Sequence, residues 1–91
     1  MIGQLATDVD MSNGSPLILF SKNNCSLCDI AEDILRENIK EIEWDFKKIN
    51  IEDDLNLLDK FKYKIPVLHR PDKNVYLYWP FPLSRLKEFL S

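Results

Sequence analysis

The sequence predicts an α/β fold with the element order β-α-β-α-β-β-α, in which a four-stranded mixed sheet carries helices on both faces. Three observations lead to this fold class. A run of consecutive apolar residues at 17–20 is typical of a strand buried on both faces. The helical periodicity that follows predicts a βαβ half with parallel strands and a right-handed crossover. Turn residues at 71–74 separate two short apolar runs and predict an antiparallel hairpin.

The N-terminal part of the chain divides into a tail and the first two elements. Residues 1–15 contain turn residues but no periodic pattern, so we expect a disordered tail ahead of a single domain at 16–91. The first strand is expected at 17–21 and the first helix at 26–38. The apolar positions that define this helix recur at helical spacing and are Leu27, Ile30, Ala31, Ile34 and Leu35.

The middle of the chain predicts a second strand and a short helix. Trp44 and Phe46 alternate while Ile49 falls on the opposite face, which indicates a strand near 43–49 with cover on both sides. Asp53-Asp54 can cap the short helix that follows, because an aspartate side chain accepts from free N–H groups of the first turn. The apolar positions of this helix are Leu55, Leu58 and Phe61.

The C-terminal part predicts the hairpin and a last helix. One strand is expected at 65–69 and contains Pro66, and its partner is expected at 75–78. The terminal helix follows a proline at position 82, where proline is compatible with a helix start. Its apolar positions are Leu83, Leu86, Phe89 and Leu90.

Composition and charge narrow the function classes. The chain has 91 residues, 45% of them hydrophobic and 30% charged, with a net charge of −3. An acidic balance argues against nucleic acid or an anionic membrane as the partner, since both reward a basic surface. No apolar run approaches the ~20 residues of a membrane span, and the first residues lack the pattern of a signal peptide. We therefore expect a cytoplasmic monomer.

The most informative motif is Cys25-Ser26-Leu27-Cys28, which holds the only two cysteines of the chain. It lies at the predicted turn from the first strand into the first helix. In a reducing compartment two cysteines are more often catalytic, metal-binding or free than structural. A disulfide that closes so short a loop also adds little stability through chain entropy.

The motif and a distant proline together carry a resemblance to a known family. A Cys-x-x-Cys after the first strand and the proline of Ile65-Pro66-Val67 are the two marks of the thioredoxin superfamily. Lys22 stands three residues before Cys25, so residues 17–90 resemble a glutaredoxin-like protein with a thioredoxin-like fold. The resemblance implies a small dithiol thiol–disulfide oxidoreductase that reduces protein or mixed disulfides, with glutathione or a reductase as its electron donor and no tightly bound cofactor.

Helix position predicts the roles of the two cysteines. Cys25 should lie at the N-cap or first turn, where free N–H groups and the helix dipole favour its thiolate. Lys22 adds a positive charge, and Asp29 opposes it. Cys28, one turn on, should face inward with Ala31 and act as the resolving thiol.

Ile65 and Pro66 are the predicted substrate-binding residues. We expect a cis peptide bond at Pro66 that faces the cysteines. The backbone of Ile65 can then pair with an extended substrate segment. The alternative is a proline of an edge strand without functional consequence.

The sequence departs from ordinary glutaredoxins in two places. Ser26 and Leu27 replace the proline and tyrosine between the cysteines, and Leu27 either sets the exposure of the pair or belongs to the core. The segment 78–82 has no glycine and no acid where glutaredoxins hold glutathione with an aspartate. We therefore expect glutathione to be a poor reductant, although Lys22 and the 60–64 lysines could still hold its carboxylates.

Other residues carry weaker signals. His69, the only histidine, favours a surface or hairpin position over a ligand or base. Trp79 and Phe81 favour core over docking surface, and the carboxylates at 52–54 favour a helix cap over a metal site. Three lysines beside Pro66 favour a solvated loop, with an anion site as the alternative; they are Lys60, Lys62 and Lys64.

Two other function classes stay open. A thioredoxin-like domain can be a redox-silent module that docks a partner. Zinc normally needs four protein ligands, which two cysteines and a distant histidine do not supply. Only a site shared between two chains, such as a glutathione-assisted iron–sulfur cluster, would satisfy the ligand count.

Overall fold

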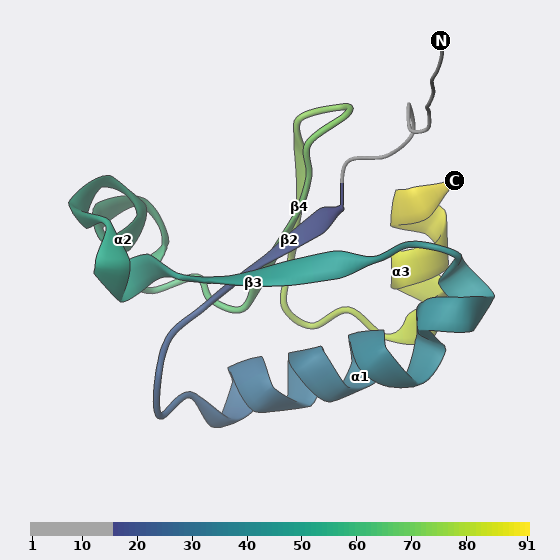
Figure 1. Ribbon diagram of the computed structural model, residues 1–91, viewed down its shortest axis with the longest axis horizontal. Coiled ribbons are helices and arrows are strands. Elements are labelled where there is room, and N and C mark those ends of the chain that lie inside the picture. Colours follow the sequence, from purple (N-terminus) through teal and green to yellow (C-terminus); the bar gives the residue numbers. More distant parts are fainter. Residues whose placement is uncertain (1–15) are drawn as a thin grey trace, which may run out of the picture.

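A computed structural model describes residues 16–91 (Figure 1). The tail expected at 1–15 lies outside the described residues. The elements follow the predicted order, with one short 3₁₀ turn added: β2 (Leu17–Ser21), α1 (Ser26–Ile42), β3 (Phe46–Asn50), η2 (Ile51–Asp53), α2 (Leu55–Phe61), β4 (Val67–Arg70), β5 (Val75–Tyr78) and α3 (Leu83–Leu90).

The strands form one four-stranded sheet in the order β3-β2-β4-β5. β2 runs parallel to β3 and antiparallel to β4, and β4 and β5 form the hairpin. Phe20 of β2 is paired with Ile49 on one side and with Val67 on the other. This mixed sheet confirms the predicted thioredoxin-like architecture.

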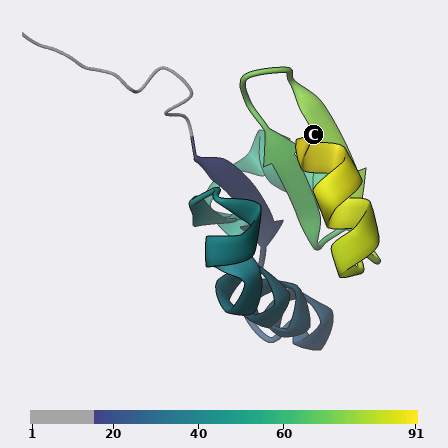
Figure 2. The same ribbon diagram turned by 90° about the vertical axis from the view of Figure 1, so that its right-hand side faces the viewer.

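Helices cover both faces of the sheet, as predicted. α1 and α3 share a core cluster with one face, centred on Leu19, Leu35, Leu68 and Leu86. α2 and η2 pack on the other face around Phe20, Ile51, Phe61 and Val67. Figure 1 shows α1 running beneath β2 and β3, and Figure 2 shows α3 lying against the hairpin.

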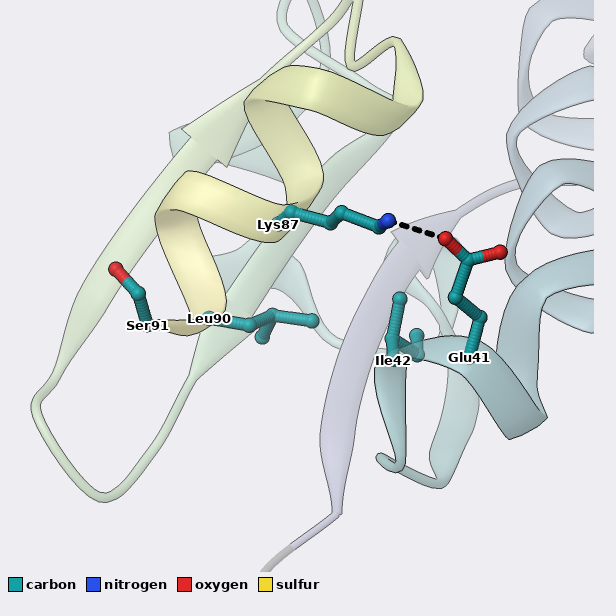
Figure 3. Close-up of a pocket in the computed structure, with 5 residues that line it drawn as sticks. All are labelled: Glu41, Ile42, Lys87, Leu90 and Ser91. Carbon is teal, nitrogen blue, oxygen red and sulfur yellow. Dashed lines mark ion pairs between the residues drawn. The ribbon is translucent and has the colours of Figure 1, made fainter.

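α1 and α3 are also joined near their C-terminal ends. Lys87 of α3 forms an ion pair with Glu41 of α1 above a hollow of about 190 Å³ (Figure 3). Arg70, 7% exposed, donates hydrogen bonds to the carbonyls of Phe89 and Ser91 and so ties the end of α3 to β4. Within residues 16–91, no helix is long and apolar enough to cross a membrane.

Three predicted boundaries were wrong. α1 continues to Ile42 because the side chain of Asn38 donates to the Ile34 carbonyl within the helix and does not end it. The helix ends where Glu43 takes a left-handed conformation and its N–H bonds to the Ile39 carbonyl. As a consequence β3 begins only at Phe46. Separately, β4 begins at Val67, after Pro66, which has no N–H to donate to a strand ladder.

Some apolar positions that were predicted to face the core are exposed. Leu27 is 45% exposed, Ile30 47% and Leu55 81%. The buried residues of α1 form a narrow stripe, and Leu27 and Ile30 fall outside it. That stripe consists of Cys28, Ala31, Leu35 and Ile42. Leu27 therefore does not belong to the core.

Candidate functional site

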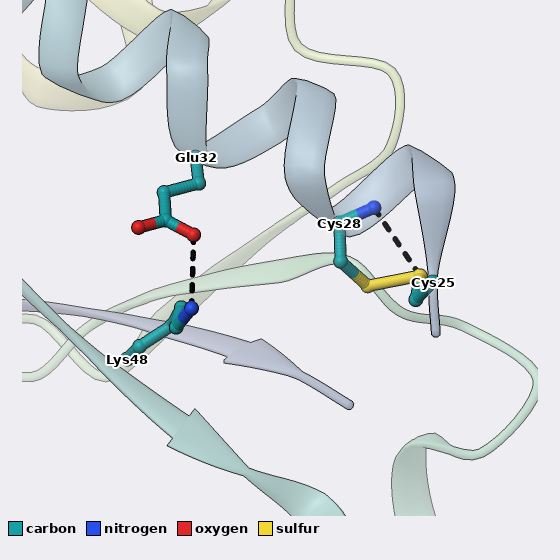
Figure 4. Close-up of a disulfide and its surroundings, with 4 residues drawn as sticks. All are labelled: Cys25, Cys28, Glu32 and Lys48. Carbon is teal, nitrogen blue, oxygen red and sulfur yellow. Dashed lines mark hydrogen bonds and ion pairs between the residues drawn. A yellow bond between two sulfur atoms is a disulfide. The ribbon is translucent and has the colours of Figure 1, made fainter. Parts of the chain in front are cut away.

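The two cysteines lie where β2 ends and α1 begins. Asn24 takes a left-handed conformation, with φ of 57°, which asparagine tolerates better than most residues. This turn sets Cys25 at the N-cap of α1, as predicted. The Sγ of Cys25 accepts a hydrogen bond of 3.2 Å from the Cys28 N–H (Figure 4). The sulfur thus takes the place of the oxygen that usually caps a helix.

Cys25 and Cys28 are joined in a disulfide, with their Cα atoms 5.2 Å apart. Their exposure differs sharply: Cys28 is buried, with 3% of its surface exposed, while Cys25 is half-buried. Cys28 faces inward with Ala31, which confirms the placement predicted for it. Only Cys25 is therefore within direct reach of a molecule in solvent.

The exposed side chains of Leu27 and Ile30 give the start of α1 an apolar outer surface. Leu27 lies between the two cysteines in sequence, and Ile30 follows one turn later. The two residues are three positions apart along the helix, so their side chains are neighbours. An apolar patch beside a half-buried sulfur can contact an apolar part of a substrate.

The peptide bond between Ile65 and Pro66 is cis, as predicted, and Pro66 is buried. Phe20 pairs with Val67, so the end of β2 and the start of β4 share one edge of the sheet. In the view of Figure 4 the chain that leads into β4 passes behind the disulfide. The N–H of Ile65 donates to the Phe61 carbonyl over 3.2 Å. A substrate strand that pairs here therefore needs the Ile65 carbonyl as its acceptor.

Two charged side chains flank the cysteines in the chain: Lys22 before them and Glu32 after them. Lys22 is exposed and forms no ion pair within residues 16–91. Glu32 lies one turn beyond Cys28, on the side of α1 that faces the strands (Figure 4). Its carboxylate accepts hydrogen bonds from Lys48 at 2.9 Å and Arg36 at 2.7 Å, which lower the pKa of Glu32 below its usual value. Two cations thus offset the negative charge of Glu32.

A second surface feature lies at the same edge of the sheet. Four residues line a hollow of about 410 Å³, which we call the tyrosine–lysine hollow: Tyr63, Lys64, Tyr78 and Trp79. Tyr63 is 90% exposed. Neither tyrosine was predicted as a site residue, although the alternation Lys62-Tyr63-Lys64 directly before Ile65-Pro66 was a visible signal.

The remaining candidates of the sequence take structural positions. His69 stacks on Tyr76 with ring centroids 4.4 Å apart, and its Nε2 hydrogen-bonds to Asn74 in the hairpin. Phe81 is fully buried and belongs to the core as predicted. Trp79 is partly buried, packs against Phe81 and also lines the tyrosine–lysine hollow, so it belongs to both core and surface. Of the acidic residues at 52–54, Asp54 caps α2. Within residues 16–91, no three metal-ligating side chains lie close enough together to hold an ion.

Known proteins are similar to this chain in sequence and fold. The family model described as "Glutaredoxin-like domain (DUF836)" matches residues 16–91. The X-ray structure of target protein XcR50 from X. campestris is 32% identical with a TM-score of 0.71, and the match covers 81% of this chain and 93% of that one. The match therefore includes almost the whole of XcR50.

Two further structures share the fold at lower identity. The solution structure of protein Ne2328 from Nitrosomonas europaea has a TM-score of 0.73 at 22% identity, over 84% of this chain and 91% of that one. Thioredoxin 1 from Thermosipho africanus has a TM-score of 0.60 at 17% identity, over 81% of this chain and 88% of that one. No curated protein matches the sequence significantly.

Proposed function

The chain belongs to the glutaredoxin-like domain (DUF836) family, and from this we propose that it is a small dithiol thiol–disulfide oxidoreductase that reduces protein or mixed disulfides. The observation that carries the proposal is the unequal exposure of the paired cysteines. A half-buried sulfur at a helix N-cap, bonded to a buried sulfur one turn away, is the arrangement that a two-step dithiol exchange needs.

In the first step the Cys25 thiolate attacks one sulfur of the substrate disulfide. The Cys25–substrate disulfide forms, the substrate S–S bond breaks, and the second substrate sulfur leaves as a thiolate that takes a proton from solvent. The free N–H groups of the first turn, among them that of Cys28, favour the anionic form of Cys25 before the attack.

In the second step Cys28 resolves the mixed disulfide. Cys28 gives its proton to solvent, and its thiolate attacks the Cys25 sulfur. The Cys25–Cys28 disulfide forms and the first substrate sulfur leaves as a thiol. Two electrons have then passed from the protein dithiol to the substrate. An external thiol, either a small thiol or the dithiol of a reductase, returns them by the reverse exchange.

Lys22, Ile65 and Pro66 hold the substrate in this proposal. Lys22 lies three residues before Cys25 and adds a positive charge for an incoming anion. The Ile65 carbonyl accepts a backbone hydrogen bond from an extended substrate segment, while Pro66 shapes the chain that passes behind the disulfide.

Glutathione is the weaker of the two donors in this proposal. The segment after β5 contains Pro80 and Pro82, which have no N–H to donate, and no carboxylate for the charged end of glutathione. A missing charge-assisted contact costs about 1.5–3 kcal/mol, which is tenfold or more in affinity. In an assay coupled to glutathione reductase, we expect slow turnover beside an ordinary glutaredoxin. Equal turnover that is lost in Lys22→Ala would show that the lysines suffice.

The direct test uses a small neutral disulfide and three forms of the reduced protein. The wild type should reduce it stoichiometrically and end as the Cys25–Cys28 disulfide. Cys28→Ser should stop at a stable mixed disulfide on Cys25, and Cys25→Ser should react far more slowly. A wild type that leaves the disulfide untouched would favour a redox-silent docking module.

A further inference from the structure

The tyrosine–lysine hollow takes no part in the two-cysteine mechanism. It lies at the edge of the sheet where β2 leads to the cysteines. Phe20 of β2 pairs with Val67 of β4, and Val67 pairs with Tyr78 of β5. Tyr78, one of the lining residues, is therefore two strand spacings, ~10 Å, from Phe20, near the end of the strand that leads to Cys25. An extended peptide advances ~3.3 Å per residue, so about three residues span this distance.

The charges around the hollow are positive and unpaired. Lys60, Lys62 and Lys64 form no ion pair within residues 16–91. Each ammonium lies over a ring instead: Lys64 is 5.8 Å from the centre of Tyr78, and Lys62 is 5.2 Å from that of Tyr63. Lys60 lies 4.9 Å from the ring of Tyr76. An aromatic face holds a cation without neutralising it, so the lysines stay free to bind carboxylates.

We propose that this hollow binds an acidic segment of the protein substrate, a few residues from the disulfide that Cys25 attacks. The inference rests on the proposed function and names its substrate class. The volume of about 410 Å³ is large enough for a bulky side chain and the backbone beside it. The aromatic walls contact the apolar part of the segment, and the lysines at the rim meet its carboxylates.

The lining favours an acidic protein segment over glutathione. Glutathione carries an α-ammonium group beside one of its carboxylates, and that ammonium needs an acceptor. None of the four lining residues is acidic, and the charges that the structure places against them are the ammonium groups of Lys62 and Lys64 and the guanidinium of Arg85, which donates to the Tyr78 carbonyl. A segment whose only charges are carboxylates brings no ammonium group that would need an acceptor on this surface.

The test compares three peptides of equal length, each with one cysteine joined by a disulfide to the same small chromophoric thiol. Glutamates, glutamines or lysines flank the cysteine at two to four positions on either side. Rapid mixing with the reduced protein gives the second-order rate constant from the released chromophore. At low salt we expect the acidic peptide to react about tenfold faster than the basic one, with the neutral peptide between them. The difference should shrink as salt is added.

Two variants assign the preference to the hollow. Lys62→Glu/Lys64→Glu should reverse the order of the peptides. Lys73→Glu is the matched control, because it also reverses the charge of an exposed lysine. Lys73 lies in the hairpin turn, at the end of the β4–β5 ladder far from Tyr78. This variant should keep the wild-type order of the peptides. The ratio of acidic to neutral rates within each variant removes any general change in reactivity.

The outcomes separate the two claims. Equal rates for the three wild-type peptides, or an acidic preference that survives in the double variant, would overturn the inference and leave the proposed function standing. A glutathione mixed disulfide that reacts faster than the acidic peptide, and slows in the double variant, would assign the hollow to glutathione instead. A wild type that reduces none of the peptides would overturn the proposed function and this inference with it.

Discussion

The N–H of Cys28 donates a 3.2 Å hydrogen bond to the sulfur of Cys25, its disulfide partner. The first turn of α1 is thus capped by the sulfur atom that acts as nucleophile in the proposed function. When the disulfide opens, the same N–H can bond to the Cys25 thiolate, because a helix N-terminus favours negative charge. Reduction then needs no new arrangement of the helix to stabilise the nucleophile.

The first prediction concerns the contribution of the α2 N-cap to the stability of the protein. The Asp54 carboxylate accepts from the N–H groups of Asn56 at 2.8 Å and Leu57 at 3.3 Å. Asp54→Ala should lower the free energy of unfolding by about 1 kcal/mol, while Asp54→Asn should retain most of it. Urea titration measures both. Asp53→Ala is the control; a loss as large there would show that Asp54 is not the cap.

Burial distinguishes two leucines of α1 that the periodicity treats alike. Leu35 is fully buried and Leu27 is 45% exposed. Leu35→Ala should cost about 2–5 kcal/mol of unfolding free energy, because it leaves a cavity in the core. Leu27→Ala should cost less than about 1 kcal/mol. Comparable losses, measured by urea titration at one temperature, would place Leu27 in the core after all.

Glu32 makes part of the stability depend on pH. Lys48 and Arg36 lower the pKa of Glu32 in the folded protein, so its contribution is present above the pKa of an unfolded glutamate and is lost as pH falls through the folded value. Glu32→Gln should destabilise the protein by less than about 1 kcal/mol at neutral pH. At about pH 3 the difference from wild type should be smaller, because an unfolded glutamate, with a pKa of about 4.3, is then largely protonated and the stabilisation is being lost.

This prediction is checked by thermal melts of the wild type, Glu32→Gln and Asp33→Asn, each at neutral pH and at about pH 3. Asp33 is exposed and forms no ion pair within residues 16–91, so its variant should follow the wild type. A Glu32→Gln penalty that grows toward acid would contradict the expected direction of the pH dependence.

The sequence was sufficient for the parts of the site that depend on local signals. A strand, a turn and a helix follow one another within residues 17–42, so the N-cap position of Cys25 and the inward position of Cys28 follow from spacing. Pro66 was recognised because its distance from the cysteines matches a known family. The apolar periodicity stops near residue 38, but the helix continues to Ile42, and the side chain of Asn38 bonds to a carbonyl inside the helix.

The parts that the sequence did not predict depend on contacts between distant segments. Helical periodicity places Leu27 and Ile30 near one face, but only the packed sheet decides which residues it covers. Tyr63 and Tyr78 line the same hollow. Tyr78 reaches it through its pairing with Val67, a register that no local pattern specifies. Sequence alone therefore predicted the cysteine pair and raised an anion site at the nearby lysines as an alternative, but it did not predict the tyrosines of the hollow.

The most direct test of the proposed chemistry is the order in which the two thiols react. The reduced wild type is treated with limiting iodoacetamide at neutral pH, and the modified peptides are quantified over time by mass spectrometry. Because Cys25 is half-buried at the helix N-cap and Cys28 is only 3% exposed, we expect Cys25 to be alkylated at least about tenfold faster. Modification of Cys28 first, or of both at equal rates, would contradict the assignment of Cys25 as the nucleophile.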